Sequence, residues 1–345
     1  MKTILVTGSG GLIGSEAVRY FLSKNNIVHG IEPNMRKVFF GPAGDVSKVI
    51  TELNKNKQYT NHNVDVRDRK GIEKLFKKIA PDIIIHCAAQ PSHDKAASIP
   101  FDDFDTNAVG TLNLLEYTRQ YCDKNAIFIH MSTNKVYGDG PNNLKLKELD
   151  KRYDFSDKKF IDGINESFSI DRCLHSLFGA SKVAADVLVQ EYGKYFEMNT
   201  AAFRGGCLTG PQHAGVALHG FLSYIVKCAV SGKDYTVFGY KGKQVRDQIH
   251  SYDVITAFDN FIADPRQGEV YNIGGQKINS ASVLEVIDII TELSGKQLNY
   301  SLSKQNRIGD HICYYSDMTK FKKHYPNWTP QYSIKDIIQE IIDNN

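Results

Sequence analysis

Three glycines near the start of the chain, Gly8, Gly11 and Gly14, follow a short apolar run and precede an apolar segment of helical periodicity. In this order, the first glycine permits a tight turn, the second lets a ligand approach the backbone, and the third allows close helix–strand packing. The helix that begins there offers unpaired N–H groups and the positive end of its dipole to an anion. We therefore predict a dinucleotide site whose pyrophosphate lies at the turn, beside Leu12 and Ile13.

An acidic residue, Glu32, follows the second apolar run, residues 27–31. Its distance from the glycines is about 20 residues, where a carboxylate accepts hydrogen bonds from the adenosine ribose of a dinucleotide. The same carboxylate would repel the 2′-phosphate of NADP, so Glu32 favours NAD, although Arg36 nearby carries the opposite charge. We assign Asn34 to the same cofactor site.

Residues after the next two strands are candidates for the rest of the cofactor site. Asp65 and Val66 end a third apolar run and are expected to meet the adenine. Ala88, Ala89 and Gln90 follow a fourth run and are expected near the bridging phosphates. Taken alone, Asp65 has an equally good interpretation as a loop cap. Its place in series with the glycines favours the cofactor role.

A second group of reactive side chains lies later in the chain. A fifth apolar run, residues 126–131, leads into Ser132 and Thr133. A helix farther on carries Phe178 and Lys182, which are four residues apart and therefore share one helix face. We expect these segments to converge on the nicotinamide end of the dinucleotide.

The order of the predicted elements explains how these side chains are brought together. Strands alternate with helices through the first half of the chain, which indicates a parallel sheet covered by helices on both faces. Ligands of such sheets bind beyond the carboxyl ends of the strands. The predicted strands are residues 2–7, 27–31, 64–66, 82–87, 126–131 and 200–204, and the predicted helices are residues 72–79, 107–121 and 183–196.

After Gly210 the alternation gives way to short strands mixed with helices. The strands are predicted at residues 235–238, 244–250 and 269–273, and the helices at residues 220–230, 254–263, 282–293 and 334–342. We predict an α/β fold: a Rossmann-type, doubly wound parallel sheet with a smaller, mixed α/β substrate-binding lobe. The NAD-binding domain would span residues 1–203, with a return at about 250–274, and the lobe residues 204–249 and 275–345.

Composition argues against several classes of function. The 345 residues carry a net charge of +3, which predicts neither a nucleic-acid surface nor a membrane surface. No apolar run is long enough to span a bilayer. The six cysteines include no Cys-x-x-Cys pair, so we expect reduced thiols, no metal site and a cytoplasmic protein.

The chain resembles the extended short-chain dehydrogenase/reductase family, the NAD-dependent epimerases and dehydratases, over nearly its whole length. The matching signals are the glycine turn, Glu32, Asp65-Val66, Asn107, Ser132-Thr133, Lys182 and Arg246-Asp247. Within this family, residues 132–139, residues 244–247 and His250 are similar to the CDP-paratose (CDP-tyvelose) 2-epimerases. Sugar 4,6-dehydratases have an Asp-Glu pair where this chain has Asn134 and Lys135, which counts against elimination chemistry.

The resemblance implies roles for most of the candidate site. Thr133 would bind the reacting hydroxyl, Lys182 the nicotinamide ribose, and Asn107 and Ser132 other parts of NAD. Arg246 and Arg307 would face the pyrophosphate of a sugar nucleotide, a natural use of the guanidinium fork. Asp310 would accept hydrogen bonds from its ribose. The other substrate contacts are assigned to Gln90, Ser92, His93, Asn134, Arg204, His219 and Phe238.

One residue departs from the family pattern, because Phe178 stands where the family has its catalytic tyrosine. A tyrosine there takes the sugar hydroxyl proton as a phenolate, and phenylalanine cannot. The replacement base is predicted among His175, Tyr137 and Lys135. His175 comes first because it lies three residues before Phe178 and an imidazole titrates near neutrality. The alternatives are a helix-start role for His175, a packing role for Tyr137 and a substrate hydrogen bond for Lys135. An impaired catalyst and an engineered substitution are the remaining explanations.

The resemblance predicts an NAD-dependent epimerase of a nucleotide diphosphate sugar, with a CDP-sugar favoured. Hydride would leave carbon 2 of the hexose and return to the other face of a 2-keto intermediate, in polysaccharide biosynthesis. The alternatives are another nucleotide-sugar redox enzyme, such as a 4-epimerase or a dehydrogenase, and a non-catalytic binding protein, which Phe178 would favour. A homo-oligomer is also expected.

Overall fold

The computed structural model describes residues 1–210, 220–303 and 310–344, and these fall into two compact units. The first unit comprises Met1–Val136, Leu177–Arg204 and Val254–Tyr271, and the second comprises Tyr137–Ser176, Gly205–Asp253 and Asn272–Asn345. Each unit contains a β-sheet and a hydrophobic core.

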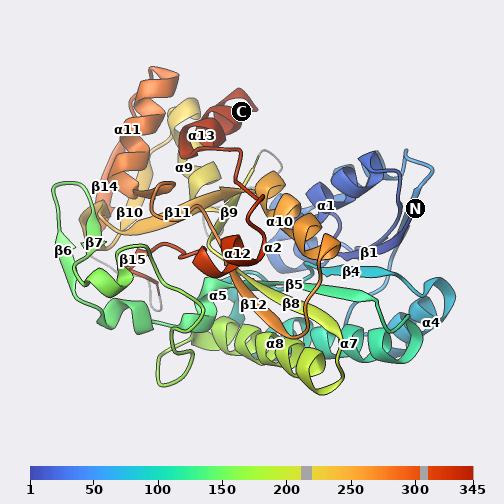
Figure 1. Ribbon diagram of the computed structural model, residues 1–345. Coiled ribbons are helices and arrows are strands. Elements are labelled where there is room, and N and C mark those ends of the chain that lie inside the picture. Colours follow the sequence, from blue (N-terminus) through green and yellow to red (C-terminus); the bar gives the residue numbers. More distant parts are fainter. Residues whose placement is uncertain (211–219, 304–309, 345) are drawn as a thin grey trace. The chain divides into compact units, whose positions relative to one another are not determined.

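A seven-stranded sheet forms the centre of the first unit (Figure 1). Its strands are β1 (Thr3–Thr7), β2 (Ile27–Ile31), β3 (Tyr59–His62), β4 (Ile83–His86), β5 (Ile127–Thr133), β8 (Asn199–Gly205) and β12 (Glu269–Ile273). Their order is β12-β8-β5-β4-β1-β2-β3, and β1 pairs in parallel with both β2 and β4. The strand order therefore reverses at β1, which is where doubly wound sheets bind ligands. This topology confirms the predicted α/β fold.

Helices cover both faces of this sheet (Figure 1). The helices α4 (Arg69–Ile79), α7 (Gly110–Tyr121) and α8 (Ser176–Tyr195) line one face, and α1 (Leu12–Ser23) and α10 (Ser251–Ala263) line the other. Under the first group, Leu75, Leu115 and Val189 pack against Leu5 and Phe128 of the strands. These apolar side chains supply the helical and strand periodicity of the sequence, so the pattern and the buried face coincide.

Short helices connect the strands near their carboxyl ends, and the sequence pattern missed them. They are α2 (Met35–Phe40), α3 (Ser47–Leu53), α5 (His93–Ala96), α6 (Pro100–Phe104) and a π-helical turn at Asp105–Val109 that leads into α7. Each has seven residues or fewer, which is too short to display a helical repeat of apolar residues.

The second unit is built on β11 (Val245–His250), which pairs with β9 (Cys207–Thr209), β13 (Ser280–Ser282) and β15 (Cys313–Tyr314). Two further pairs are β10 (Tyr235–Phe238) with β14 (Tyr300–Ser303), and β6 (Leu146–Glu148) with β7 (Tyr153–Phe155). The helices α9 (Phe221–Ser231), α11 (Val283–Ser294) and α13 (Ile334–Asp343) enclose one core, in which Ile337, Ile338 and Ile341 pack against α9 and α11. A short helix, α12 (Thr319–His324), precedes α13.

Two boundaries differ from the prediction. The predicted NAD-binding domain included residues 137–176, whereas the structure groups Tyr137–Ser176 with the second unit. The reason is non-local pairing: the Tyr153 N–H donates to the Lys243 carbonyl at 3.0 Å, and Ile164 forms a parallel bridge with Ser316. The third strand ends at His62, so Asp65 and Val66 lie in the loop beyond it.

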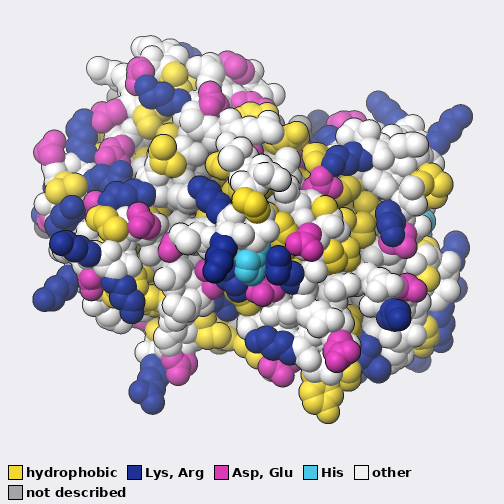
Figure 2. Space-filling model, viewed as in Figure 1, with side chains coloured by type: hydrophobic (Ala, Val, Ile, Leu, Met, Phe, Trp, Pro, Cys, Tyr) yellow, Lys and Arg dark blue, Asp and Glu magenta, His cyan; other side chains and the backbone are white. Residues whose placement is uncertain are grey.

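The described part of the chain contains no helix that is long and apolar enough to cross a membrane. On the face shown in Figure 2, Lys and Arg side chains are interspersed with Asp and Glu side chains. This mixture agrees with the small net charge of +3.

Candidate functional site

The glycine-rich turn has the close contacts that its spacing predicts. Gly8 has a φ of 66°, and a Cβ there would lie 2.9 Å from the Ala88 nitrogen. A Cβ on Gly14 would lie 2.1 Å from the Gly8 carbonyl oxygen, so only glycine lets α1 pack this close to the turn. Gly11 is the N-cap of α1 and supplies no side-chain acceptor. The turn thus fits a pyrophosphate, because α1 begins there without a side-chain cap and the first N–H groups of a helix lack partners within the helix.

Glu32 is held at this turn by two backbone donors. Its Oε2 accepts from the Gly10 N–H at 3.2 Å and its Oε1 from the Asn34 N–H at 2.8 Å. Burial raises the pKa of this carboxyl, although both hydrogen bonds and the charge of Arg36 lower it. The side chain of Asn34 does something different from the prediction: its Nδ2 donates to Asp45 and Ser47, which fixes the next loop.

Asp65 forms a two-point ion pair with Arg67. The Oδ1 of Asp65 accepts from Nε of Arg67 at 3.0 Å and Oδ2 accepts from Nη2 at 2.9 Å. Arg67 also contacts Asp102 at the start of α6. Val66 is buried, with its Cγ2 2.7 Å from where a Cβ on Gly110 would lie. This pair occupies the Asp65 carboxylate, and the adenine contact remains a prediction.

The loop at Ala88–Gln90 is positioned by a buried relay that the sequence analysis missed. The Ala88 N–H donates to Thr7 Oγ1 at 3.0 Å, and that hydroxyl lies 2.7 Å from His86 Nδ1. His86 Nε2 lies 2.9 Å from Thr111 Oγ1, which donates to the Asn107 carbonyl at 2.6 Å. Burial lowers the pKa of His86 to about 3, so the ring is neutral and serves as one donor and one acceptor.

Asn107 and Asp103 tie this loop to α8. Asn107 Oδ1 accepts from the Gln90 N–H at 2.9 Å, and its Nδ2 donates to Ser181 Oγ at 3.0 Å. Asp103 accepts from Gln90 Nε2 at 2.8 Å and from Ser181 Oγ at 2.6 Å. These side chains are all buried. Asn107 therefore joins the loop at Gln90 to α8. Nothing in the sequence pattern singled out Asp103.

Lys182 lies within hydrogen-bond distance of the end of β5. Its Nζ donates to the Met131 carbonyl at 2.9 Å and to His130 Nε2 at 3.1 Å, and the residue is only 3% exposed. Burial lowers the pKa of Lys182 to about 8, against the opposing charge of Asp186. Burial and Lys182 together hold the pKa of His130 well below its ordinary value, so its ring is the neutral acceptor. A buried, readily deprotonated lysine of this kind is typical of active sites.

Phe178 lies one helical turn before Lys182 and is 8% exposed. Its ring lies beside that of His93 at the start of α5, with centroids 6.4 Å apart and planes tilted by 51°. This distance is within the range of direct aromatic contact. Thr133 ends β5 in the same unit, and its Oγ1 accepts from the Lys135 N–H at 3.2 Å.

Two predicted ligand contacts are instead engaged in the core of the first unit. Ser132 Oγ donates to Asp186 Oδ2 at 2.6 Å, so the hydroxyl assigned to the cofactor is used by α8. Arg204 forms a two-point ion pair with Asp186, at 3.1 Å and 2.8 Å, and both side chains are almost fully buried. Arg204 is thus used within the fold, and its assignment to the substrate remains a prediction. Its guanidinium ties β8 to α8.

The structure weakens two of the three predicted bases. The hydroxyl of Tyr137 donates to Asn272 Oδ1 at 2.7 Å, and the ring is fully buried against Phe168 and Tyr314, which fits a packing role. His175 precedes α8, and Ser176 has a φ of 61°, so His175 does not share the helix face of Phe178 as predicted. His175 lies 3.6 Å from Cys173 Sγ. Lys135 is half-buried in the turn after β5 and remains a candidate.

Arg246 and Asp310, two of the residues predicted to bind the nucleotide, contact each other in the second unit. Arg246 on β11 is buried, and its Nη2 donates to Asp310 Oδ1 at 2.6 Å and to the His311 carbonyl. The Asp310 side chain is 35% exposed, so this carboxylate faces both the arginine and solvent. Phe238 at the end of β10 is exposed. His219 and Arg307 lie outside the described residues.

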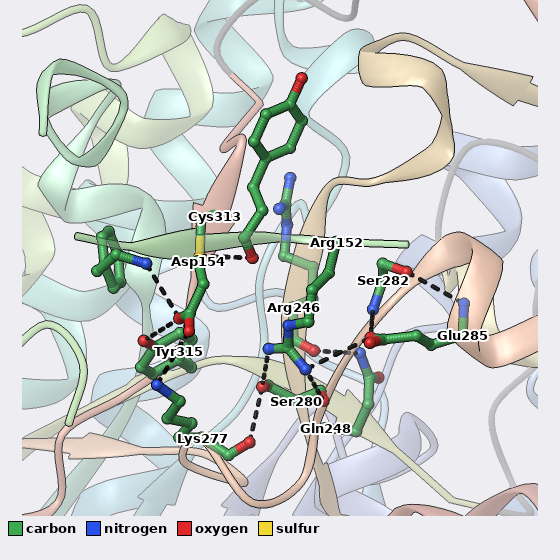
Figure 3. A network of polar contacts seen from close by, with 12 residues as sticks. Arg152, Asp154, Arg246, Gln248, Lys277, Ser280, Ser282, Glu285, Cys313 and Tyr315 are labelled. Atoms are coloured by element: carbon green, nitrogen blue, oxygen red, sulfur yellow. Dashed lines mark hydrogen bonds and ion pairs between the residues drawn. The ribbon is translucent and has the colours of Figure 1, made fainter. Parts of the chain in front are cut away.

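A polar network holds Arg152 and Asp154 against β13 and the end of β15, the strands on either side of Arg246 (Figure 3). Arg152 donates to Ser280 Oγ at 2.7 Å and contacts Glu285, which caps α11 through Ser282. Asp154 accepts from the Tyr315 hydroxyl at 2.8 Å and from Lys277 at 3.1 Å. Because Ser280 pairs with β11 at Asp247, the network fixes the strand that carries Arg246.

Comparison with known proteins finds related sequences over most of the chain. The NAD dependent epimerase/dehydratase family matches residues 4–274. The chain is 31% identical to the CDP-paratose 2-epimerase of Salmonella typhi, covering 99% of this chain and 98% of that protein. It is 30% identical to the dTDP-glucose 4,6-dehydratase of Haemophilus influenzae, covering 97% of this chain and 90% of that protein.

Solved structures show the same fold. A tyrosine-to-phenylalanine mutant of the UDP-glucuronic acid 4-epimerase of Bacillus cereus, in complex with UDP-4-deoxy-4-fluoro-glucuronic acid and NAD, superposes with a TM-score of 0.80 at 25% identity. That match covers 99% of this chain and 98% of the other. The UDP-glucose 4-epimerase of Thermotoga maritima gives a TM-score of 0.81 at 23% identity, over 99% and 98% of the two chains.

Proposed function

Because the chain belongs to the NAD dependent epimerase/dehydratase family, we propose that it is an epimerase that inverts carbon 2 of a CDP-hexose. The observation that carries this proposal is the loop after β5, where Asn134 and Lys135 follow Thr133. A 4,6-dehydratase of the family would have an acid pair at these two positions. The likeness to a CDP-paratose 2-epimerase over 99% of the chain supports the choice of carbon 2 as the inverted centre and of cytosine as the nucleobase.

NAD is the cofactor, and when bound it accepts a hydride from the sugar and returns it. The backbone of the Gly8–Gly14 turn would bind its pyrophosphate, and Glu32 would accept hydrogen bonds from its ribose. Lys182 would hold the nicotinamide ribose and add a positive charge beside the reacting hydroxyl. Thr133 would orient that hydroxyl from the end of β5.

Arg246 and Asp310 would bind the nucleotide half of the substrate. The guanidinium of Arg246 suits a diphosphate because its fork donates two parallel hydrogen bonds. Binding would exchange the Asp310 contact for the phosphate and leave the Asp310 carboxylate for a ribose. The second unit thus supplies affinity for the nucleotide, and the first unit supplies the chemistry.

The test is conversion of defined sugar nucleotides by the NAD-loaded protein. CDP-paratose, UDP-glucose, UDP-glucuronic acid and dTDP-glucose are incubated separately, and the products are analysed by proton NMR. We expect inversion at carbon 2 of CDP-paratose with no release of NADH. Inversion at carbon 4 of either UDP-sugar would replace the proposal with a 4-epimerase, and loss of water from dTDP-glucose would replace it with a dehydratase.

A further inference from the structure

We propose that His93 is the proton acceptor that takes the place of the tyrosine absent at position 178, an inference that rests on the proposed epimerase function. The observation is the contact between the two rings: the imidazole of His93 lies 6.4 Å, centroid to centroid, from the phenyl ring of Phe178. The imidazole therefore adjoins the residue that stands at the tyrosine position of the family.

The other histidines of the first unit have different surroundings. His86 and His130 are fully buried, and burial holds the pKa of each ring far below its ordinary value. His86 is held between two threonine hydroxyls and His130 by Lys182. His29 and His62 lie on β2 and β3 and contact each other at 3.0 Å. His93, by contrast, has its ring beside that of Phe178.

The position of His93 relative to Phe178 is set by buried hydrogen bonds. His93 follows Ser92, whose N–H donates to Gln90 Oε1 at 2.7 Å and whose hydroxyl caps α5. Gln90 Nε2 donates to Asp103, and Asp103 accepts from Ser181 on α8. The Ser181 hydroxyl also lies 2.9 Å from the Phe178 carbonyl oxygen. The loop that presents His93 and the helix that presents Phe178 are thus parts of one network.

The chemistry needs only a neutral imidazole and a nearby cation. Lys182, one turn from Phe178, is protonated below its pKa of about 8 and favours the alkoxide over the alcohol.

Proton and electrons balance within the site. In the first half-reaction, His93 accepts the hydroxyl proton as the O–H bond breaks, and the electron pair of the adjacent carbon–hydrogen bond leaves as the hydride that NAD takes. A carbonyl remains at that carbon. In the second half-reaction, the hydride would return to the opposite face of the carbonyl carbon while His93 gives its proton back to the oxygen and returns to the neutral form. No outside oxidant or reductant is consumed.

The test uses three variants of the NAD-loaded protein with CDP-paratose. His93→Asn should lower turnover by about 10²-fold or more, a typical general-base contribution, with NAD binding unchanged. The double variant His93→Asn/Phe178→Tyr should regain at least about tenfold of that loss, because a phenol then stands beside Thr133 and Lys182. His62→Asn, a histidine of the same unit outside the site, is the matched control and should keep wild-type turnover.

Turnover of His93→Asn within threefold of the wild type, or no gain from the added tyrosine, would overturn the proposal. A wild-type protein that converts none of the four sugar nucleotides would refute the proposed function instead. His93 is then judged by binding alone, on protein with ¹⁵N-labelled histidine. We expect the ring nitrogens of His93 to shift when at least one of the four is added, while those of His62 stay in place. Unmoved His93 resonances would overturn the proposal independently of turnover.

Discussion

The Glu32 carboxylate has two backbone donors and faces the glycine turn, so at the scale of single residues we expect it to determine which dinucleotide binds. Removing its charge while keeping its shape, as in Glu32→Gln, should weaken the contact to the ribose and end the repulsion of a 2′-phosphate. We expect NAD to bind the wild type at least about tenfold more tightly than NADP, since a charge-assisted hydrogen bond contributes roughly 1.5–3 kcal/mol. In Glu32→Gln the ratio of NADP to NAD dissociation constants should be smaller than in the wild type, and titration calorimetry with each dinucleotide measures both constants.

A pH series adds a second check on Glu32. Because burial raises the pKa of its carboxyl, the charged form that binds the ribose is lost at a higher pH than for an exposed glutamate. NAD affinity should therefore fall on acidification in the wild type and change less in Glu32→Gln. Equal affinities for NAD and NADP in the wild type would show that Arg36 overrides the carboxylate.

Individual residues were predictable where a backbone constraint fixes the residue type. Gly8 and Gly14 were found because their close contacts admit no side chain. The pairing of Arg204 with Asp186 was missed because an arginine at the end of a strand looks the same in sequence whether it meets a ligand or a buried carboxylate. His93 was predicted as a substrate contact, but its relation to Phe178 depends on folding that sequence spacing does not show.

At the scale of elements, the Asp186–Arg204 pair joins α8 to the sheet. Arg204→Met should leave the Asp186 carboxylate buried without its counter-ion and lower the free energy of unfolding by about 3–5 kcal/mol. The double variant Asp186→Leu/Arg204→Met should lose less, because no unpaired charge remains. Urea denaturation followed by circular dichroism measures both. A single variant as stable as the wild type would show that Arg204 does not support the fold.

Element prediction succeeded where one face of an element is apolar over several turns or residues. Strands β2, β10 and β12 have the predicted bounds, and α4, α9 and α11 differ by a few residues. The short helices around the site were not predicted, because their positions depend on the conformations of the neighbouring loops. The interpretation of His175 failed for a related reason, since the left-handed Ser176 ends the helical geometry between His175 and Phe178.

At the scale of the whole molecule, Asp247 makes stability depend on pH. The residue is fully buried, and burial raises its pKa to about 6, although the Ser316 and Gln276 N–H groups donate to it. The unfolded chain has an aspartate pKa of about 3.9, so the folded state binds the proton more tightly. The stability gained from this proton is complete below about pH 4 and is lost as the pH rises to about 6.

Asp247→Asn should remove this dependence, because an amide does not titrate. Between pH 4.5 and 7.5, we expect the wild type to lose about 2 kcal/mol of unfolding free energy relative to the variant. Chemical denaturation at both pH values measures the difference, and the other carboxyls cancel in the comparison. A difference that is the same at both pH values would mean that Asp247 titrates normally.

The division into units was only partly predictable. Residues 137–176 follow β5 directly, and their own sequence contains no sign that Tyr153 and Ile164 pair with Lys243 and Ser316. These two pairs join residues about 90 and 150 positions apart, so they depend on the completed fold. The periodicity within residues 137–176 carries no information about such distant partners. The homo-oligomer expected from the sequence remains a prediction, and size-exclusion chromatography with light scattering tests it.

Arg246 belongs to the second unit, so its replacement should affect nucleotide binding and leave NAD binding intact. Arg246→Ala removes the guanidinium from β11, and because Asp310 is partly exposed, its carboxylate can be solvated and the unit should still fold. Binding of CDP should weaken by roughly 1.5–3 kcal/mol, about 10- to 150-fold, because a charge-assisted contact to the diphosphate is lost. Binding of NAD should be unchanged, since the glycine turn and Glu32 belong to the other unit.

Arg246→Lys is the matched control for this variant, since it keeps the charge and loses the fork. We expect it to bind CDP with an affinity between those of the wild type and the alanine variant, because an ammonium group attracts the diphosphate without the two parallel hydrogen bonds. Calorimetric titrations with CDP and with NAD measure the two affinities separately. An Arg246→Ala protein that keeps CDP and loses NAD would reverse the assignment of the units. Equal weakening of both ligands would place Arg246 in the framework of the protein rather than at the nucleotide.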